Sequence, residues 1–556
     1  MTARPRIALF SGPLGTIENT APLITSDKAR ARYGLPINHS SRFDALRPQR
    51  LAAPVTVYVE QFSAHPLEAD AAALYAPPDG FVDGSGAFHA ERQSPDDKPV
   101  YAIELRPDDG LYPLPYFGRQ ADGSAWDATG STPAAPAERS RQTFLPDASR
   151  LVEEIDRFGV GPDGHASRLS ALADFDHIRV LPSGGYSHGL AEAQRSDLGE
   201  GDIDPEALGI DYFPYFPPML RRDPPLASLA RILDIVSATL SNDRYDGAVW
   251  LESSIGLEET AYWLGLLVDT AKPIVAVCAP ESPHGVLGNT GDRNLVDAVS
   301  YITSGVWADS AGHDRVGPVL IDSGRILSAR ESMKTDARSG GLVGTGSVGV
   351  IGNIARTERP HLAMVPRRRS THRSALLASG WPASVRGVVG ASDGGERQVV
   401  EVVLRDPGGR VRPEVLPRVS IAKNGRYVVD EERTVEAWLA GALGQAPLAG
   451  IVAEGSTPYG GMDMATEAVL RRALYSGVPY VKVGRGNPEG YVTRDTAPFG
   501  IAGGDLASPK ARLLLIACLL RFGAPPPAVD PTRPTPDEVA AVSGHLARFQ
   551  EAFDEH

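Results

Sequence analysis

From Pro224 onward, short apolar segments alternate with segments whose apolar residues recur at helical spacing. This alternation constrains the fold more than any other feature of the sequence. Leu226–Leu240 has the pattern of an amphipathic helix. A strand at Gly247–Leu251, a helix at Leu257–Asp269 and a strand at Ile274–Ala279 follow it. Strands joined by helices predict a parallel sheet covered on both faces. Such sheets bind ligands at the carboxyl ends of their strands.

The alternation continues along the chain with one interruption. A helix at Asn294–Thr303 and a strand at Val319–Asp322 extend the first region, and residues 366–415 are then basic and Gly-rich. Later strands are expected at 418–422, 450–454 and 479–483, and helices at 434–443, 464–475 and 509–522, the last as a terminal helix. The sequence therefore predicts an α/β protein with two domains. These are a larger, doubly wound N-terminal domain at 1–370, a linker or hairpin at 371–415, and a smaller parallel C-terminal domain at 416–556.

The first part of the chain differs in character. A strand at Arg6–Phe10 runs into the turn Ser11–Gly15. Residues 36–205 are rich in Pro and Gly and have only scattered strand-like pieces, at 55–60, 100–105 and 178–181, and one amphipathic helix at 148–158. Long loops of this kind usually belong to functional lids or inserted elements. We interpret 36–205 as an insertion in the N-terminal domain.

Charge and cysteine content restrict the possible functions. Lys and Arg number 55 against 69 Asp and Glu, a net charge of −14, which argues against a nucleic-acid or anionic-membrane binder. No apolar run reaches the roughly 18 residues of a membrane span, and Ile7–Phe10 is too short for the core of a signal peptide. The two cysteines, Cys278 and Cys518, lie in apolar surroundings. They exclude a disulfide scaffold and favour a reducing, cytoplasmic location.

Three polar clusters lie at the ends of expected strands, at Gly15–Ile17, Glu252–Ala261 and Ser328–Thr335. In the second cluster, Ser253 and Ser254 lie between a buried strand and a helix. The free backbone N–H groups of a helix start favour anions there. Taken alone, each cluster also has a purely structural explanation. The serine would cap the helix, and the lysine of the third cluster would lie in solvent.

Together and in this order, the clusters resemble the motifs of the asparaginase/glutaminase family, α/β amidohydrolases with a threonine nucleophile. The family's first motif, Gly-Thr-Ile, is Gly15-Thr16-Ile17 here. Its second motif ends in His-Gly-Thr-Asp-Thr-(Leu/Met)-Glu-Glu-Thr-Ala, and the corresponding residues are Glu252-Ser-Ser-Ile-Gly-Leu-Glu-Glu-Thr-Ala261. Asp505–Arg512 resembles the closing Leu-Asn-Pro-Gln-Lys-Ala-Arg motif. The resemblance covers about 5–35 and 210–556, with no counterpart for much of 60–205.

The resemblance implies a role for four residues. Thr16 corresponds to the nucleophile, Ser254 to the second catalytic hydroxyl, and Lys334 to the lysine paired with that hydroxyl. Tyr33 is the candidate for the tyrosine that is hydrogen-bonded near the nucleophile. Such a set suits amide hydrolysis, because a threonine hydroxyl is a weak nucleophile without a neighbouring base. A lysine can be that base only when its pKa is lowered.

The substrate-binding positions depart from the family pattern. Ile255 replaces the aspartate that binds the substrate's α-ammonium group, and Glu252 replaces the family's histidine. The serine that binds the α-carboxylate is either missing before the helix at 226–240 or is Ser63, and the sequence leaves both alignments open. Ser253 completes this candidate binding set.

The sequence therefore predicts an asparaginase-like amidohydrolase that works through an acyl-enzyme on a small amide other than free L-asparagine. Two alternatives remain: an ordinary L-asparaginase or glutaminase, and a non-catalytic relative that binds a ligand or protein. The family resemblance implies no metal or organic cofactor and a homodimer or homotetramer. Convergence of Thr16, Ser254 and Lys334 in space would separate an enzyme from a binding protein.

Overall fold

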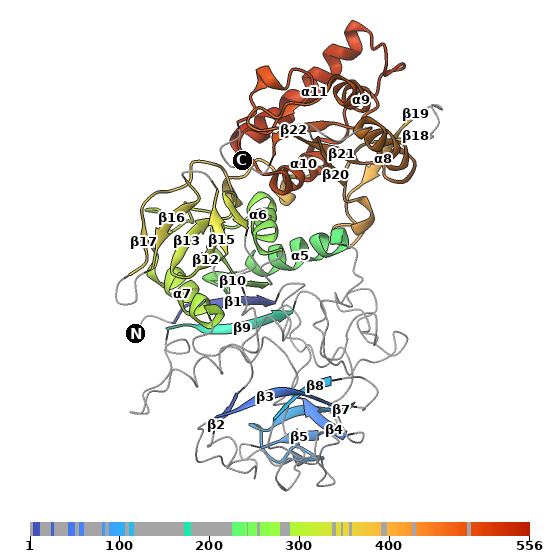
Figure 1. Ribbon diagram of the computed structural model, residues 1–556. Helices are drawn as coiled ribbons and strands as arrows, with labels where there is room; N and C mark the ends of the chain where they lie inside the picture. The colour runs from blue at the N-terminus through green and yellow to red at the C-terminus, as the bar shows by residue number, and fades with distance from the viewer. Residues whose placement is uncertain are drawn as a thin grey trace. The chain divides into compact units, whose positions relative to one another are not determined.

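The structure is a computed structural model in which the described residues form two compact units (Figure 1). The first unit comprises Met1–Asp223, Arg244–Ser254 and Val277–Thr303, and the second comprises Pro224–Asp243, Ile255–Ala276 and Ser304–His556. The domain boundaries expected at 370 and 415 stay a prediction. The described residues are 4–11, 24–26, 43–50, 55–59, 80–83, 88–105, 111–115, 172–179, 225–241, 243–252, 256–278, 290–335, 341–345, 348–354, 359–390, 397–424, 430–485 and 491–556.

The first unit contains three parallel strands with β1 in the middle. Strand β1 (Arg6–Ser11) pairs with β10 (Gly247–Glu252) on one side and with β9 (Asp174–Arg179) on the other. Every residue of β10 is buried, as expected for a strand in a sheet covered on both faces. Helix α7 (Thr290–Ser304) follows later in the chain, and β11 (Ile274–Cys278) crosses the boundary between the two units.

The region interpreted as an insertion contributes β9 and all strands but β2 of two small antiparallel sheets. The sheets have the strand orders β2-β3-β8 and β4-β7-β5-β6. Two of the expected strands correspond to β4 and β7, whereas β9 begins earlier than its expected segment at 178–181. The helix expected at 148–158 lies outside the described residues. The strands are β2 (Ile24–Ser26), β3 (Phe43–Arg50), β4 (Val55–Val59), β5 (Gly80–Val82), β6 (Phe88–His89), β7 (Lys98–Leu105) and β8 (Leu111–Pro115).

The second unit begins with two helices and a run of short strands. Helices α5 (Pro225–Leu240) and α6 (Leu257–Leu267) form where helical spacing predicts them. After β12 the chain turns back, so the parallel pattern expected from the sequence does not continue. The order β12-β13-β16-β17 is antiparallel throughout, and β14 forms a separate hairpin with β15. The strands are β12 (Val319–Asp322), β13 (Arg325–Ser328), β14 (Ser332–Lys334), β15 (Leu342–Gly344), β16 (Val350–Asn353) and β17 (His361–Leu362).

The second unit also contains a four-stranded parallel sheet in the order β20-β21-β22-β23. A hairpin of β18 (Ser384–Gly390) and β19 (Arg397–Val403) precedes it, within the segment expected to be a linker or hairpin. The strands are β20 (Arg418–Lys423), β21 (Ala449–Gly455), β22 (Tyr480–Gly484) and β23 (Ile501–Ala502), and the helices are α8 (Glu431–Gln445), α9 (Met464–Tyr475), α10 (Ser508–Phe522) and α11 (Pro536–Glu555). Short 3-10 helices lie at Thr371–Arg373, Ala378–Gly380, Pro413–Val415 and Arg494–Thr496.

Helix α10 connects the two parts of the second unit, because it packs against both α6 and the parallel sheet. Both helices are buried on nearly all sides, which fits their central position. Helix α10 is not the terminal helix expected from the sequence, since α11 follows it and packs against it. None of the helices in the described part of the chain combines the length and apolar character that crossing a membrane requires. The mixed α/β class predicted from the sequence is confirmed.

Candidate functional site

Two of the eight residues selected from the sequence lie in the described part of the chain, and they are Glu252 and Lys334. Convergence of the three proposed catalytic side chains therefore stays a prediction. The remaining six lie outside the described residues, namely Thr16, Tyr33, Ser63, Ser253, Ser254 and Ile255.

Glu252 is the last residue of β10, and its side chain is almost completely buried. Its Oε2 accepts a hydrogen bond of 2.7 Å from the indole Nε1 of Trp250 in the same strand. Trp250 is itself fully buried and stacks at a tilt on Phe10 of β1. The carboxylate at the end of this strand is thus held by an aromatic pair in the sheet.

Helix α6 begins shortly after Glu252, and the structural explanation for Ser254 as its N-cap is wrong. The N-cap is Gly256, which makes no side-chain capping hydrogen bond. Glu258 and Glu259 lie in the first turn, where carboxylates interact favourably with the helix dipole.

Lys334 ends the three-residue strand β14, opposite Leu342 of β15, and its side chain is half-buried. Its backbone N–H donates a long hydrogen bond of 3.4 Å to Oε1 of Glu258. This contact ties the strand that carries the lysine to the first turn of α6. In sequence, that turn comes directly after the segment that contains Ser254 and Ile255.

Glu258 is a buried carboxylate that, in the described part of the chain, has hydrogen bonds to only one of its two oxygens. Its Oε2 has no hydrogen-bond partner among the described residues. Burial raises the pKa of Glu258 above its usual value, while the nearby Lys510 amine opposes that rise. A buried carboxylate of this kind is stable only with a compensating positive charge.

Lys510 supplies that charge from helix α10. Its side chain is fully buried, and its Nζ donates to the backbone carbonyl of Glu258 and, at 2.9 Å, to that of Ala329. Burial lowers the pKa of Lys510 to about 8, although Glu258 and Glu259 favour the charged amine. The amine thus joins α6 to the segment just before β14.

The same segment carries a buried ion-pair network centred on Arg330. Its guanidinium contacts Glu331 at 2.7 Å and Asp505 at 2.9 Å. Ser328 donates a hydrogen bond of 2.6 Å to the other oxygen of Glu331. Burial alone would lower the pKa of Arg330, but the neighbouring carboxylates outweigh that effect and raise it. Arg330 and Lys510 therefore fix the segment that leads into Lys334 from two sides.

The structure adds Glu258 and Lys510 to the candidate site as supporting residues. In the sequence both residues appear only as parts of motifs, Glu258 in the second motif and Lys510 in the closing one. The available signal was chemical, because Lys510 interrupts an apolar helix that becomes almost entirely buried. A lysine in that setting requires polar partners.

We expect the stabilisation lost in Lys510→Met to increase with pH. The pKa of Lys510 is about 8 in the fold against 10.5 for the ordinary amine. Between these values the unfolded chain binds more protons, so folding becomes more favourable as pH rises. Denaturant unfolding of wild type and variant across this window should show a widening difference. Lys423→Met is the control, because Lys423 is exposed in the fold. A difference that stays constant across this window would show that the pKa of Lys510 is not lowered in the fold.

The comparisons with known proteins agree with these motifs. Residues 222–364, which include Glu252, Glu258 and Lys334, match the family model described as "Asparaginase, N-terminal". The chain is 26% identical over 206 residues to L-asparaginase 2 of Bacillus subtilis, covering 34% of this chain and 52% of that protein. It is 25% identical over 287 residues to L-asparaginase 2-3 of Saccharomyces cerevisiae, covering 51% and 66%. The match thus spans about half the length of the first of these relatives.

A solved structure described as a probable cytoplasmic L-asparaginase from Campylobacter jejuni is also similar to this chain. The sequence identity is 18% and the TM-score is 0.45, and the likeness covers 70% of this chain and 93% of that one. The fold is a mixed α/β one. The family match over residues 222–364 and the sequence relatives support membership of the asparaginase family.

Proposed function

We propose that this protein is an asparaginase-like amidohydrolase that cleaves the C–N bond of a small-molecule amide. Family membership supports hydrolase chemistry on such bonds. The observation that carries the proposal furthest is the anchoring of the Lys334 strand. The strand that carries Lys334 is hydrogen-bonded to Glu258, and Glu258 is in turn hydrogen-bonded to the buried Lys510. Such anchoring is expected for a lysine whose exact position matters for catalysis.

The proposed reaction uses four side chains. The hydroxyl of Thr16 attacks the amide carbonyl, and the amine leaves with a proton to give an ester of Thr16. Water then hydrolyses the ester, releases the acid and restores the hydroxyl. Ser254 and Lys334 relay the proton, and Tyr33 hydrogen-bonds near the nucleophile. The role of each residue comes from the family pattern and from the need of a hydroxyl nucleophile for a partner base.

The proposed substrate is not free L-asparagine. An isoleucine at position 255 provides no carboxylate for an α-ammonium group, and transferring that cation next to an apolar side chain is unfavourable. Glu252 adds little to such binding, because its Oε2 already accepts the Trp250 indole and its side chain is buried. Ser253 and Ser63 complete the proposed binding set. We expect the substrate to lack a free α-ammonium group.

The remaining parts of the proposal concern the setting of the enzyme. The two cysteines in the described residues are free and buried, which is compatible with a cytoplasmic location. A homodimer or homotetramer is proposed from the family alone. The reaction as written needs no metal or organic cofactor, and the chain's acidic balance does not favour a nucleic-acid or membrane partner.

A substrate panel tests the proposal. Purified protein is assayed for ammonia or amine release from L-asparagine, L-glutamine, N-substituted amides, cyclic imides and amides without an α-amine. We expect turnover mainly on the last three classes. The Thr16→Ala variant is the control for nucleophile-dependent activity. Efficient Thr16-dependent hydrolysis of L-asparagine would restore the ordinary family activity, and silence across the panel would favour the binding-protein alternative.

We expect Ile255→Asp to increase L-asparagine turnover at least about 10-fold relative to wild type, because a well-placed charged partner contributes about 1.5–3 kcal/mol. Turnover of amides without an α-amine should fall at the same time. Ile255→Asn is the matched control, since it is polar and similar in shape but uncharged. An equal gain in both variants would show that size, not charge, selects the substrate.

A further inference from the structure

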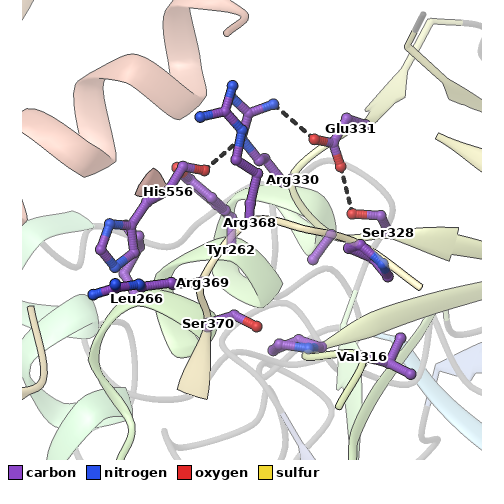
Figure 2. A pocket seen from close by; sticks show the side chains of 14 residues that line it. Tyr262, Leu266, Val316, Ser328, Arg330, Glu331, Arg368, Arg369, Ser370 and His556 are labelled. Carbon is purple, nitrogen blue, oxygen red and sulfur yellow. Dashed lines mark hydrogen bonds and ion pairs between the residues drawn. The ribbon is translucent and has the colours of Figure 1, made fainter. Parts of the chain in front are cut away.

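A pocket whose lining includes none of the proposed catalytic residues lies within the second unit (Figure 2). Helix α6 contributes Tyr262 and Leu266, the segment before β14 contributes Arg330, and the segment at 366–370 contributes Arg368 and Ser370. We call it the arginine pocket. It is a small, partly open pocket, with room for a single functional group.

Two buried hydroxyls in the pocket lack partners. Neither Oη of Tyr262 nor Oγ of Ser370 has a hydrogen-bond partner among the described residues. The tyrosine is 5% exposed, so it cannot exchange its protein contacts for bulk water. Buried polar atoms are nearly always satisfied, and those that are not require an explanation. A bound group that accepts hydrogen bonds would provide one.

The charge of the pocket favours an anion. Three guanidinium groups line it against one carboxylate, that of Glu331, which already binds Arg330 and Ser328 (Figure 2). Burial lowers the pKa of His556 to about 4, so this imidazole is neutral at pH 7. Arg330 and Arg369 are also paired with Asp505 and Glu555, so the positive charge that remains for an anion comes from Arg368.

Arg368 is the guanidinium of the lining that pairs with no carboxylate among the described residues. Arg330 uses its donors on Glu331, Asp505 and the His556 carbonyl, and Arg369 pairs with Glu555 at 2.9 Å. For Arg368 the structure gives one side-chain hydrogen bond, to the Asp554 carbonyl. A guanidinium can donate five, in a planar fork that matches oxyanions.

We propose that the arginine pocket binds a small oxyanion, a carboxylate or phosphate group, through the Arg368 guanidinium and the hydroxyls of Tyr262 and Ser370. Leu266 and Val316 give the rest of the lining an apolar character. They therefore limit the polar part of the ligand to one group. This inference does not depend on the proposed amidase activity.

Calorimetric titration of the full chain with inorganic phosphate at constant ionic strength tests the proposal. Wild type should bind phosphate saturably. Tyr262→Phe should weaken binding about 3- to 10-fold, and Arg368→Gln about 10- to 100-fold, as expected for a neutral and a charged hydrogen bond. Tyr262→Phe removes only an unsatisfied hydroxyl, so the variant should unfold at or above the wild-type temperature.

Two matched controls separate the pocket from general effects. Arg367→Gln removes the same charge from an adjacent, exposed residue outside the lining, and Tyr475→Phe removes a hydroxyl from a buried tyrosine elsewhere in the unit. Both should bind phosphate like wild type. Acetate that competes with phosphate identifies a carboxylate ligand, and acetate that does not identifies phosphate; either supports the proposal. No binding to wild type, or equal losses in Arg367→Gln and Arg368→Gln, overturns it.

Discussion

Replacing Lys334 by methionine is expected to lower kcat/KM for the best amide of the panel about 10²- to 10⁴-fold, the range of a lost general acid or base. The fold should persist, because the hydrogen bond to Glu258 uses the backbone N–H of Lys334, which the variant keeps. Its side chain is half-buried at the end of a short hairpin, so methionine can occupy the same space. Steady-state kinetics and thermal unfolding of the two proteins measure both effects.

Lys334→Arg distinguishes proton transfer from charge. Arginine keeps the positive charge but is not deprotonated in proteins, so it cannot act as a base. If Lys334 transfers a proton, the Lys334→Arg variant should have a kcat/KM about as low as that of Lys334→Met. If the residue only provides charge, Arg should recover much of the activity. Lys423→Met, on an exposed strand position, controls for the loss of any lysine. Full activity in Lys334→Met would remove this residue from the mechanism.

The α/β elements could be predicted from the sequence because their burial produces readable patterns. Strands β10 and β21 are buried along their whole length and therefore appear as continuous apolar runs. Amphipathic helices such as α5 show their spacing directly. The antiparallel strands β16 and β17 have four and two residues, too few to show any period. Their pairing depends on turns and neighbours that a single sequence does not specify.

Helix α11 was readable but was not recognised. Thr535 and Glu538 form a capping box with Pro536 at the first helical position. This pattern is a sequence signature of a helix start. Apolar residues then recur on one buried face, including Val542, Phe549 and Phe553. The sequence therefore contains the signal for a helix beyond 522, although the helix at 509–522 was expected to be the last.

The candidate site shows the corresponding limit for function. Motif order could place Lys334 and the acidic first turn of α6, because both belong to recognisable local patterns. The contact between Lys510 and Glu258 could not be predicted, since these residues lie 252 positions apart and belong to different motifs. Long-range polar pairs follow from how helices pack, and one sequence without relatives gives no register for that packing.

The same long-range pair should have a large effect on stability. We expect Lys510→Met to lower the free energy of unfolding by about 3 kcal/mol at neutral pH, because two buried carbonyls lose their donor and a buried carboxylate loses a nearby positive charge. Methionine fits the volume but leaves the Glu258 and Ala329 carbonyls without this donor, and it leaves the Glu258 carboxylate without its cation. Denaturant unfolding of wild type and variant measures the loss.

A double-mutant cycle with Glu258→Gln identifies the origin of that loss. If the uncompensated carboxylate is the main cost, Lys510→Met should be less harmful when Glu258 is already neutral, and the two losses should fall short of additivity by at least about 1 kcal/mol. Arg512→Met is the matched control on the same helix. Its pair with Glu259, 2.7 Å long, is about one-third exposed, so we expect a loss below about 1 kcal/mol. Additive losses, or equal losses at 510 and 512, would show that Lys510 does not compensate Glu258 and that another contact joins α10 to the lysine strand.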